Sequence, residues 1–85
     1  MKKFEFVIKD EMGIHARPAG LLVKEAKKYE SKITIVKEGR QAAATKLMAV
    51  MGLGGECGQN VEVVIEGADE DCAFEDIKAF FEVNL

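Results

Sequence analysis

The sequence is short of several residue types that mark particular classes of protein. Its 85 residues include no tryptophan, one proline, one histidine and two cysteines. The cysteines, Cys57 and Cys72, form no CxxC or Cys/His grouping, so we expect reduced thiols and neither a metal site nor a bound cofactor. No run approaches the roughly 20 apolar residues that cross a bilayer, and MKKFEFVIKD lacks the apolar core of a secretion signal. These absences predict a cytoplasmic protein with no stable membrane association.

Charge is distributed unevenly along the chain. Residues 1–46 contain eleven Lys and Arg against six Asp and Glu, whereas residues 47–85 contain one Lys against nine acidic residues, so the halves carry +5 and −8 and sum to −3. A basic half could contact nucleic acid, but no basic cluster is interleaved with aromatic residues and the whole chain is acidic. We therefore predict no nucleic-acid binding, and an acidic protein surface as the better partner for the basic half.

Hydrophobic periodicity predicts four strands and three helices. The period of two marks four segments as strands: residues 3–9, 32–37, 40–44 and 61–66. The helical period marks three more: residues 18–29, 46–53 and 70–81. A tight turn at Glu38–Gly39 should join the second and third strands into a hairpin. Thr45 and Asp69 are in place to cap the second and third helices.

The element order β-α-β-β-α-β-α predicts a single α+β domain, residues 1–85, without linker or repeat. Every strand alternates and each of the three helices must bury one face, so the economical arrangement is an open-faced β-sandwich, an antiparallel sheet with helices on one face. A ferredoxin-like module that binds a small ligand shares the order β-α-β-β-α-β. Its sheet order, 4-1-3-2, would distinguish it.

The segment GIHARPAG contains the only histidine, and we interpret it as the candidate site. Pro18 suits the first turn of a helix, where a backbone N–H has no partner. The N–H groups of Ala16 and Arg17 then form, with Pro18, a cradle for an anion beside His15. The alternative is that His15 is merely a solvated or capping residue.

The chemistry that this arrangement favours is phosphoryl transfer. The positive helix end and Arg17 disfavour a cationic ring, which leaves a neutral nitrogen of His15 free to attack phosphorus. The phosphoryl group would then meet the helix N–H groups and the guanidinium. Positioning and charge stabilisation are most of what such a transfer requires of a protein.

Three stretches, GIHARPAGLLVKEAKKY, TKLMAVMGLG and EGADED, resemble in order and spacing the HPr phosphocarrier proteins of the bacterial phosphoenolpyruvate:sugar phosphotransferase system. The resemblance spans almost all of the chain. It implies a phosphocarrier rather than an enzyme, in which Enzyme I phosphorylates His15 on Nδ1, Arg17 stabilises the phosphate, and IIA domains of sugar permeases receive it. It also implies the sheet order 1-4-2-3 beneath three helices. A purely regulatory HPr-like binding protein, which carries no phosphate in sugar flux, is the alternative.

The helix of residues 46–53 is apolar nearly all round, so it cannot bury every side chain in so small a domain. Val50 and Leu53 can face the core. The remaining apolar residues are expected to contact partners, although the methionines could instead fill the core. With the outward residues of the first helix, the expected partner surface comprises Leu21, Lys24, Lys27, Lys46, Leu47, Met48 and Met51.

Lys46 departs from the pattern that the resemblance implies. Many Gram-positive HPr proteins have a regulatory serine at this position, and a lysine cannot be phosphorylated by the serine kinase. We therefore expect no regulatory serine here and no corepressor function that depends on one. Thr45 is interpreted as a helix cap, and Lys46 as added positive charge for an acidic partner. We expect a monomer.

Overall fold

Alternating apolar residues build the strands and the helical repeat builds the helices, in the predicted order. The computed structural model describes all residues, Met1–Leu85. Its elements are β1 (Lys2–Val7), α1 (Ala16–Ala26), β2 (Lys32–Lys37), β3 (Arg40–Ala43), α2 (Leu47–Gly52), β4 (Asn60–Glu66) and α3 (Glu70–Asn84). None of the helices combines the length and the apolar character that crossing a membrane requires.

The four strands form one antiparallel sheet in the order β1-β4-β2-β3. β4 lies inside the sheet, where Val63 pairs with Phe4 of β1 on one side and with Ile35 of β2 on the other. Glu38 and Gly39 have φ values of 51° and 78°, the positive values that a two-residue hairpin turn needs, and β2 pairs with β3 as predicted. The order confirms 1-4-2-3 and rejects the ferredoxin-like alternative.

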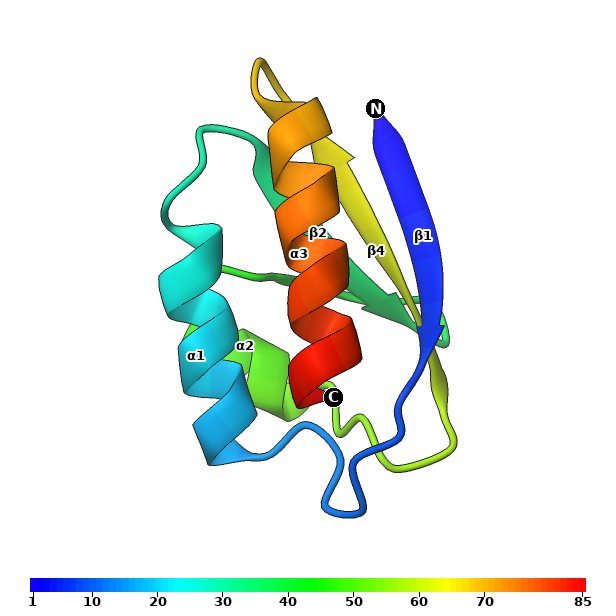
Figure 1. Cartoon of the computed structure of the whole chain (residues 1–85). Helices are drawn as coiled ribbons and strands as arrows, with labels where there is room; N and C mark the ends of the chain where they lie inside the picture. The colour runs from blue at the N-terminus through cyan, green and yellow to red at the C-terminus, as the bar shows by residue number, and fades with distance from the viewer.

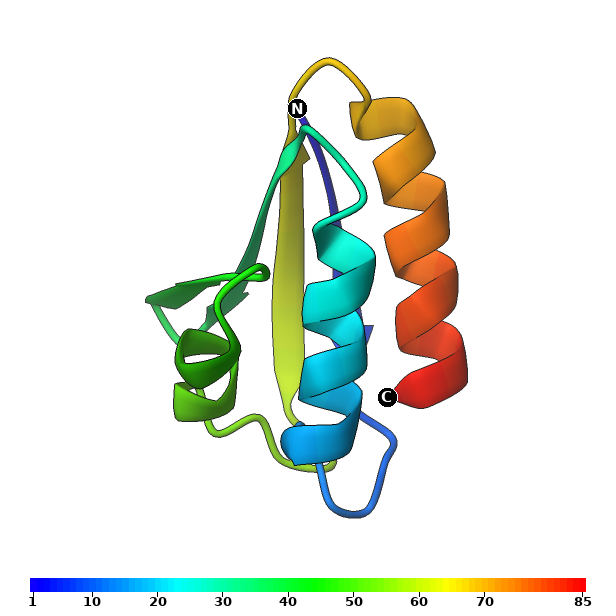
Figure 2. The same cartoon turned by 90° about the vertical axis from the view of Figure 1, so that its left-hand side faces the viewer.

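The three helices cover one face of the sheet, which makes the fold the predicted open-faced sandwich. α1 and α3 lie side by side and antiparallel, and α2 packs against α1 (Figures 1 and 2). A cluster of 18 buried apolar residues fills the space between the layers, and Val61 and Val63 of β4 have no exposed surface there. Phe4 of β1 packs edge-on against Phe81 of α3, with ring centroids 5.7 Å apart.

Two helix starts differ from the expectation. α1 begins at Ala16 instead of Pro18, so the residue after His15 already belongs to the helix. α2 begins at Leu47 with Lys46 as its N-cap, and the prediction that Thr45 caps it was wrong. The backbone N–H of Lys46 donates to the carbonyl of Ala43 at 3.0 Å, which closes a turn after β3 and starts the helix one residue later.

Asp69 is the N-cap residue of α3 as predicted, but its carboxylate does not bond to its own helix. It accepts the backbone N–H groups of Glu30 and Ser31, each at 2.9 Å, and the Ser31 hydroxyl. These hydrogen bonds, that from the hydroxyl first, lower the pKa of Asp69 below its ordinary value. The side chain therefore ties the loop between α1 and β2 to the start of α3.

The loops that precede α1 and follow α2 meet at one end of the molecule, beside the last residue of α3 (Figures 1 and 2). Ile14 donates its backbone N–H to the carbonyl of Gly55 at 2.7 Å. Asp10 donates its backbone N–H to the carbonyl oxygen of Leu85 at 2.8 Å. Segments distant in sequence thus hold the residues just before α1 in one position.

Candidate functional site

His15 is the N-cap residue of α1, but its ring does not form a capping hydrogen bond. Its backbone is extended, with φ −102° and ψ −178°, and its carbonyl accepts the N–H of Ala19 at 3.0 Å. No side-chain hydrogen bond caps the helix, and the side chain is 31% exposed. The ring therefore stands at the solvent edge of the helix end, available to a group brought by another molecule.

The N-terminus of α1 offers two unpaired amides next to this ring. The N–H groups of Ala16 and Arg17 have no backbone acceptor, because they belong to the first turn. Pro18 is buried and holds the start of the helix against the core. Arg17 is exposed and forms no ion pair with an acidic side chain. Two amides and a free guanidinium can together hold an anion such as a phosphoryl group.

Asp10 and Met12 also lie at this site, and the sequence reasoning missed both. The Oδ1 atom of Asp10 is 3.9 Å from Nε2 of His15. The same oxygen accepts the backbone N–H of Met12 at 2.8 Å. This hydrogen bond closes a turn of a kind that Asp side chains form readily. The side chain of Met12 is 73% exposed. The presence of an Asp in this loop could have indicated a turn. It could not have indicated that the turn brings the carboxylate close to the ring of His15.

Exposed apolar side chains gather on the segments around His15. Four of the seven large apolar residues that are exposed belong to the loop before α1, to α1 and to α2: Met12, Leu21, Leu47 and Met48. Leu21 and Leu47 are 41% and 40% exposed, and Met48 is 79% exposed. α1 and α2 pack against each other, so these exposed residues belong to neighbouring elements. Val50 and Leu53 of the same short region face the core, as predicted.

The remaining expected partner residues lie at different depths and distances. Lys24 and Lys46 are exposed on α1 and at the start of α2. Lys27 is exposed too, but it follows the last turn of α1, roughly 18 Å along the axis from His15. Met51 is half-buried and packs against the core cluster. Met51 thus has the smallest surface to offer a partner.

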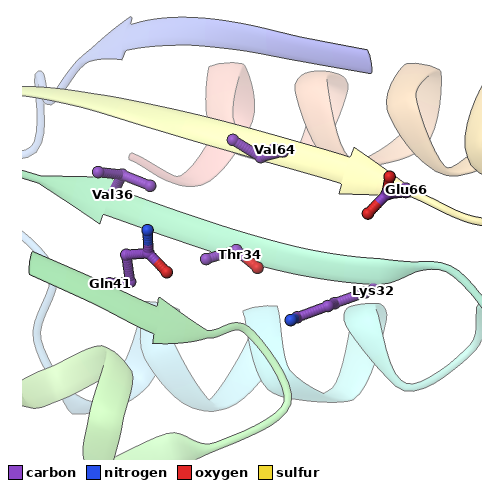
Figure 3. A pocket seen from close by; sticks show the side chains of 6 residues that line it. All are labelled: Lys32, Thr34, Val36, Gln41, Val64 and Glu66. Atoms are coloured by element: carbon purple, nitrogen blue, oxygen red, sulfur yellow. The ribbon is translucent and has the colours of Figure 1, made fainter. Parts of the chain in front are cut away.

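No depression of the surface includes His15 or Arg17. One depression of about 160 Å³ lies on the uncovered face of the sheet, lined by outward residues of three strands (Figure 3): Lys32, Thr34, Val36, Gln41, Val64 and Glu66. No group of three or more His, Cys, Asp or Glu side chains is placed to hold a metal ion. The His15 site is therefore open, and the surface of another molecule can reach it.

The cysteines are exposed and unpaired. The negative charge of Asp76, which lies beside Cys72, raises the pKa of that thiol, and so less of it is thiolate. Cys57 donates only a long contact of 3.6 Å, to the carbonyl of Lys9. Neither cysteine is part of the His15 site.

The chain matches the family model described as the PTS HPr component phosphorylation site over residues 2–83. The phosphocarrier protein HPr of Mycoplasma genitalium is 42% identical over 85 residues, which cover 99% of this chain and 97% of that protein. HPr-C-His from Thermoanaerobacter tengcongensis has a similar structure, with a TM-score of 0.93 and 36% identity over 99% of this chain and 94% of that one. Crh, the Bacillus subtilis catabolite repression containing protein, is similar as a swapped dimer, with a TM-score of 0.78, 29% identity and coverage of 100% and 98%.

Proposed function

The chain belongs to the HPr phosphocarrier family of the bacterial phosphoenolpyruvate:sugar phosphotransferase system, and from this premise we propose that His15 carries the phosphoryl group. The protein is a phosphocarrier of that system and not an enzyme. In the proposed cycle, phospho-Enzyme I donates the group to His15, and the phosphorylated chain passes it to IIA domains of sugar permeases. No bound cofactor takes part in this cycle.

The observation that carries the proposal is the free ring of His15 at the N-terminus of α1. A neutral ring nitrogen attacks the phosphorus of the donor, a nitrogen–phosphorus bond forms, and the bond to the donor breaks with its electron pair left on the donor. The phosphoryl oxygens then lie within reach of the unpaired amides of Ala16 and Arg17. Onward transfer is the same step in reverse, with the IIA domain as acceptor.

Arg17 is proposed to stabilise the phosphoryl group both during transfer and in the phosphorylated state. Its guanidinium is exposed and has no acidic partner to compete with a phosphate. A guanidinium matches the geometry of phosphate oxygens and keeps its charge throughout the reaction. Such a residue stabilises the negative charge that develops on the phosphoryl group during transfer.

The proposed docking surface combines apolar residues of the loop before α1, of α1 and of α2 with lysines on or next to these two helices: Met12, Leu21, Lys24, Lys27, Lys46, Leu47, Met48 and Met51. Its apolar part can bury area against a partner, and flexible methionines can repack against partners of unlike shape. Its lysines favour an acidic partner and speed the encounter with it. Enzyme I and several IIA domains would use this same surface in turn.

Lys46 is proposed to remove serine-kinase control from this carrier. It stands at the start of α2, where the resemblance places a regulatory serine, and it presents a cation there. Thr45 is half-buried one residue earlier. We therefore expect no kinase-dependent switch at the start of α2.

The second candidate function is that of a regulatory protein that resembles Crh and carries no phosphate. The 29% identity to Crh makes this comparison relevant, but both His15 and Arg17 are present here and the HPr of Mycoplasma genitalium is 42% identical. The His15 site is complete within one chain, since its ring, amides and guanidinium all come from one segment. We therefore propose a cytoplasmic monomer that carries phosphate.

Incubation with Enzyme I and phosphoenolpyruvate tests the proposal. The chain should gain one acid-labile, base-stable phosphate, and His15→Ala should gain none although it folds. The phosphorylated chain should then label a IIA domain. Equal labelling of His15→Ala would show that the phosphate is carried elsewhere, and failure to restore sugar uptake in a strain without its own carrier would favour the regulatory alternative.

A further inference from the structure

We propose that Asp10 is a positioning residue for His15, whose carboxylate holds the ring proton on Nε2 and leaves Nδ1 free to take the phosphoryl group. This inference rests on the proposed function, because it assigns a role in the transfer at His15. It does not follow from the GIHARPAG segment, since Asp10 precedes that segment and reaches the ring through a turn.

Only one nitrogen of the His15 ring, Nε2, faces an acidic side chain. Oδ1 of Asp10 lies 3.9 Å from Nε2 of His15, and no other acidic side chain forms an ion pair with the ring. The two side chains are about equally accessible, at 33% and 31%. A carboxylate attracts a proton on the nitrogen that it faces and repels a lone pair there. The Nε2–H tautomer is therefore favoured, and the lone pair that can attack phosphorus is on Nδ1.

Asp10 is itself held in place by the backbone. Its Oδ1 accepts the N–H of Met12 at 2.8 Å, and its carbonyl accepts the N–H of Gly13 at 2.9 Å. Its own N–H donates to the carbonyl oxygen of Leu85 at 2.8 Å. One hydrogen bond therefore holds the carboxylate, and two hold the backbone of Asp10, relative to the loop that leads to His15. A carboxylate that is fixed in this way can orient an imidazole, as the Asp of a Ser-His-Asp triad does.

The carboxylate of Asp10 also acts on the charge of the His15 ring during the transfer. When Nδ1 attacks, its bond to phosphorus forms as the bond to the donor breaks, and the donor keeps that electron pair. The ring keeps the proton on Nε2 and becomes positively charged, and this charge develops facing Asp10. A separation of 3.9 Å is longer than a hydrogen bond, but a small rotation of the ring closes it. The carboxylate thus stabilises the positive charge that develops on the ring during the transfer.

The test compares Asp10→Asn with Glu11→Gln. Asparagine keeps an oxygen that can accept the N–H of Met12, so the turn is preserved while the charge is lost. Glu11 is exposed and forms no ion pair, so Glu11→Gln removes the same charge one residue away. Asp10→Ser, which also keeps a short acceptor for the turn, is the second variant if Asp10→Asn folds poorly.

Imidazole nitrogen–proton NMR correlations of the neutral ring, at about pH 9, report the tautomer directly. The wild type and Glu11→Gln should contain mainly the Nε2–H form, and Asp10→Asn should contain less of it. Phosphorylation by Enzyme I should slow roughly threefold to tenfold in Asp10→Asn, with an unchanged half-saturating concentration.

The same tautomer ratio and rate in Asp10→Asn as in Glu11→Gln would overturn the inference. So would a rise in the half-saturating concentration alone, since that would make Asp10 a docking residue. A tautomer shift in a protein that accepts no phosphate would refute the proposed function and still support the hold of Asp10 on the ring. The NMR measurement needs no phosphate, so the two failures are distinguishable.

Discussion

Gly13 and Gly55 approach each other so closely that no side chain fits between them. A Cβ on Gly13 would stand 2.2 Å from the carbonyl oxygen of Gly55, and Gly13 has a φ of 69°. The same oxygen accepts the N–H of Ile14 at 2.7 Å. The residues just before His15 therefore rest directly on the loop after α2, which sets the distance between the proposed phosphate site and the exposed residues of α2.

Replacement of Gly13 by alanine should destabilise the protein. The left-handed backbone costs a residue with a Cβ about 1–2 kcal/mol, and the contact with Gly55 adds to that cost, so the free energy of unfolding should fall by about 2 kcal/mol or more. Urea denaturation measures the change. Gly20→Ala is the matched control, because nothing lies within 4 Å of the added Cβ and alanine favours a helix. Equal stability of the two variants would contradict this account.

Arg17→Ala should slow phosphorylation and onward transfer on the order of 10–1000-fold, because it removes a charge-assisted contact to the developing phosphoryl charge. The urea midpoint should stay within error of the wild type, since Arg17 is exposed. Rapid-quench measurement of phosphate on His15 gives the rate. Arg17→Lys should recover only part of it, because a lysine lacks the planar fork of donors. A wild-type rate in Arg17→Ala would reduce Arg17 to a surface charge.

Lys46→Glu should weaken docking on Enzyme I or a IIA domain, and more at low salt than at high salt. Exposed charges are screened over about 8–10 Å at ordinary ionic strength, so an effect that depends on the charge of Lys46 must shrink as salt is added. Titration calorimetry at two salt concentrations measures it. Lys3→Glu, on the solvent face of β1, is the control and should bind as the wild type does.

Mass spectrometry tests the proposal that Lys46 removes serine-kinase control. Kinase and ATP should leave the mass of the wild-type chain unchanged, because lysine offers no hydroxyl at that position. Phosphate on Thr45 would show instead that control had moved by one residue. Equal affinities of the wild type and Lys46→Glu at every salt concentration would place Lys46 outside the docking surface.

Asp69 should make stability depend on pH in the acid range. Its folded pKa is lowered, by the Ser31 hydroxyl first and then by the N–H of Glu30, so its contribution is complete above its unfolded value and is lost as pH falls through the folded one. Between about pH 6 and pH 3, the urea midpoint of the wild type should fall more steeply than that of Asp69→Asn. Asp71→Asn removes a charge from the same helix turn and should keep the wild-type slope. Parallel slopes in all three proteins would contradict the role of Asp69.

The element types and the buried faces followed from local periodicity, because a side chain on the wrong face of a strand or helix cannot reach the core. The prediction that Val50 and Leu53 face the core was correct for this reason. The start of α2 was wrong by one residue, since the turn to Ala43 outweighs the capping preference of Thr45. Periodicity did not determine the sheet order, because an antiparallel strand finds similar partners in several positions.

By itself, the sequence determined that this chain forms four alternating strands and three helices, and that its only histidine stands with an arginine at a helix start. Those features depend on residues close together along the chain, where the period of the backbone decides the outcome. Only the tertiary structure decided that Asp10 faces the ring of His15 and that Asp69 secures a distant loop. The carbonyls of Gly55 and Leu85 seat the loop before α1, and Asp69 bonds to Ser31, 38 residues away along the chain. Hydrogen bonds between segments so far apart leave no periodic signature in the sequence.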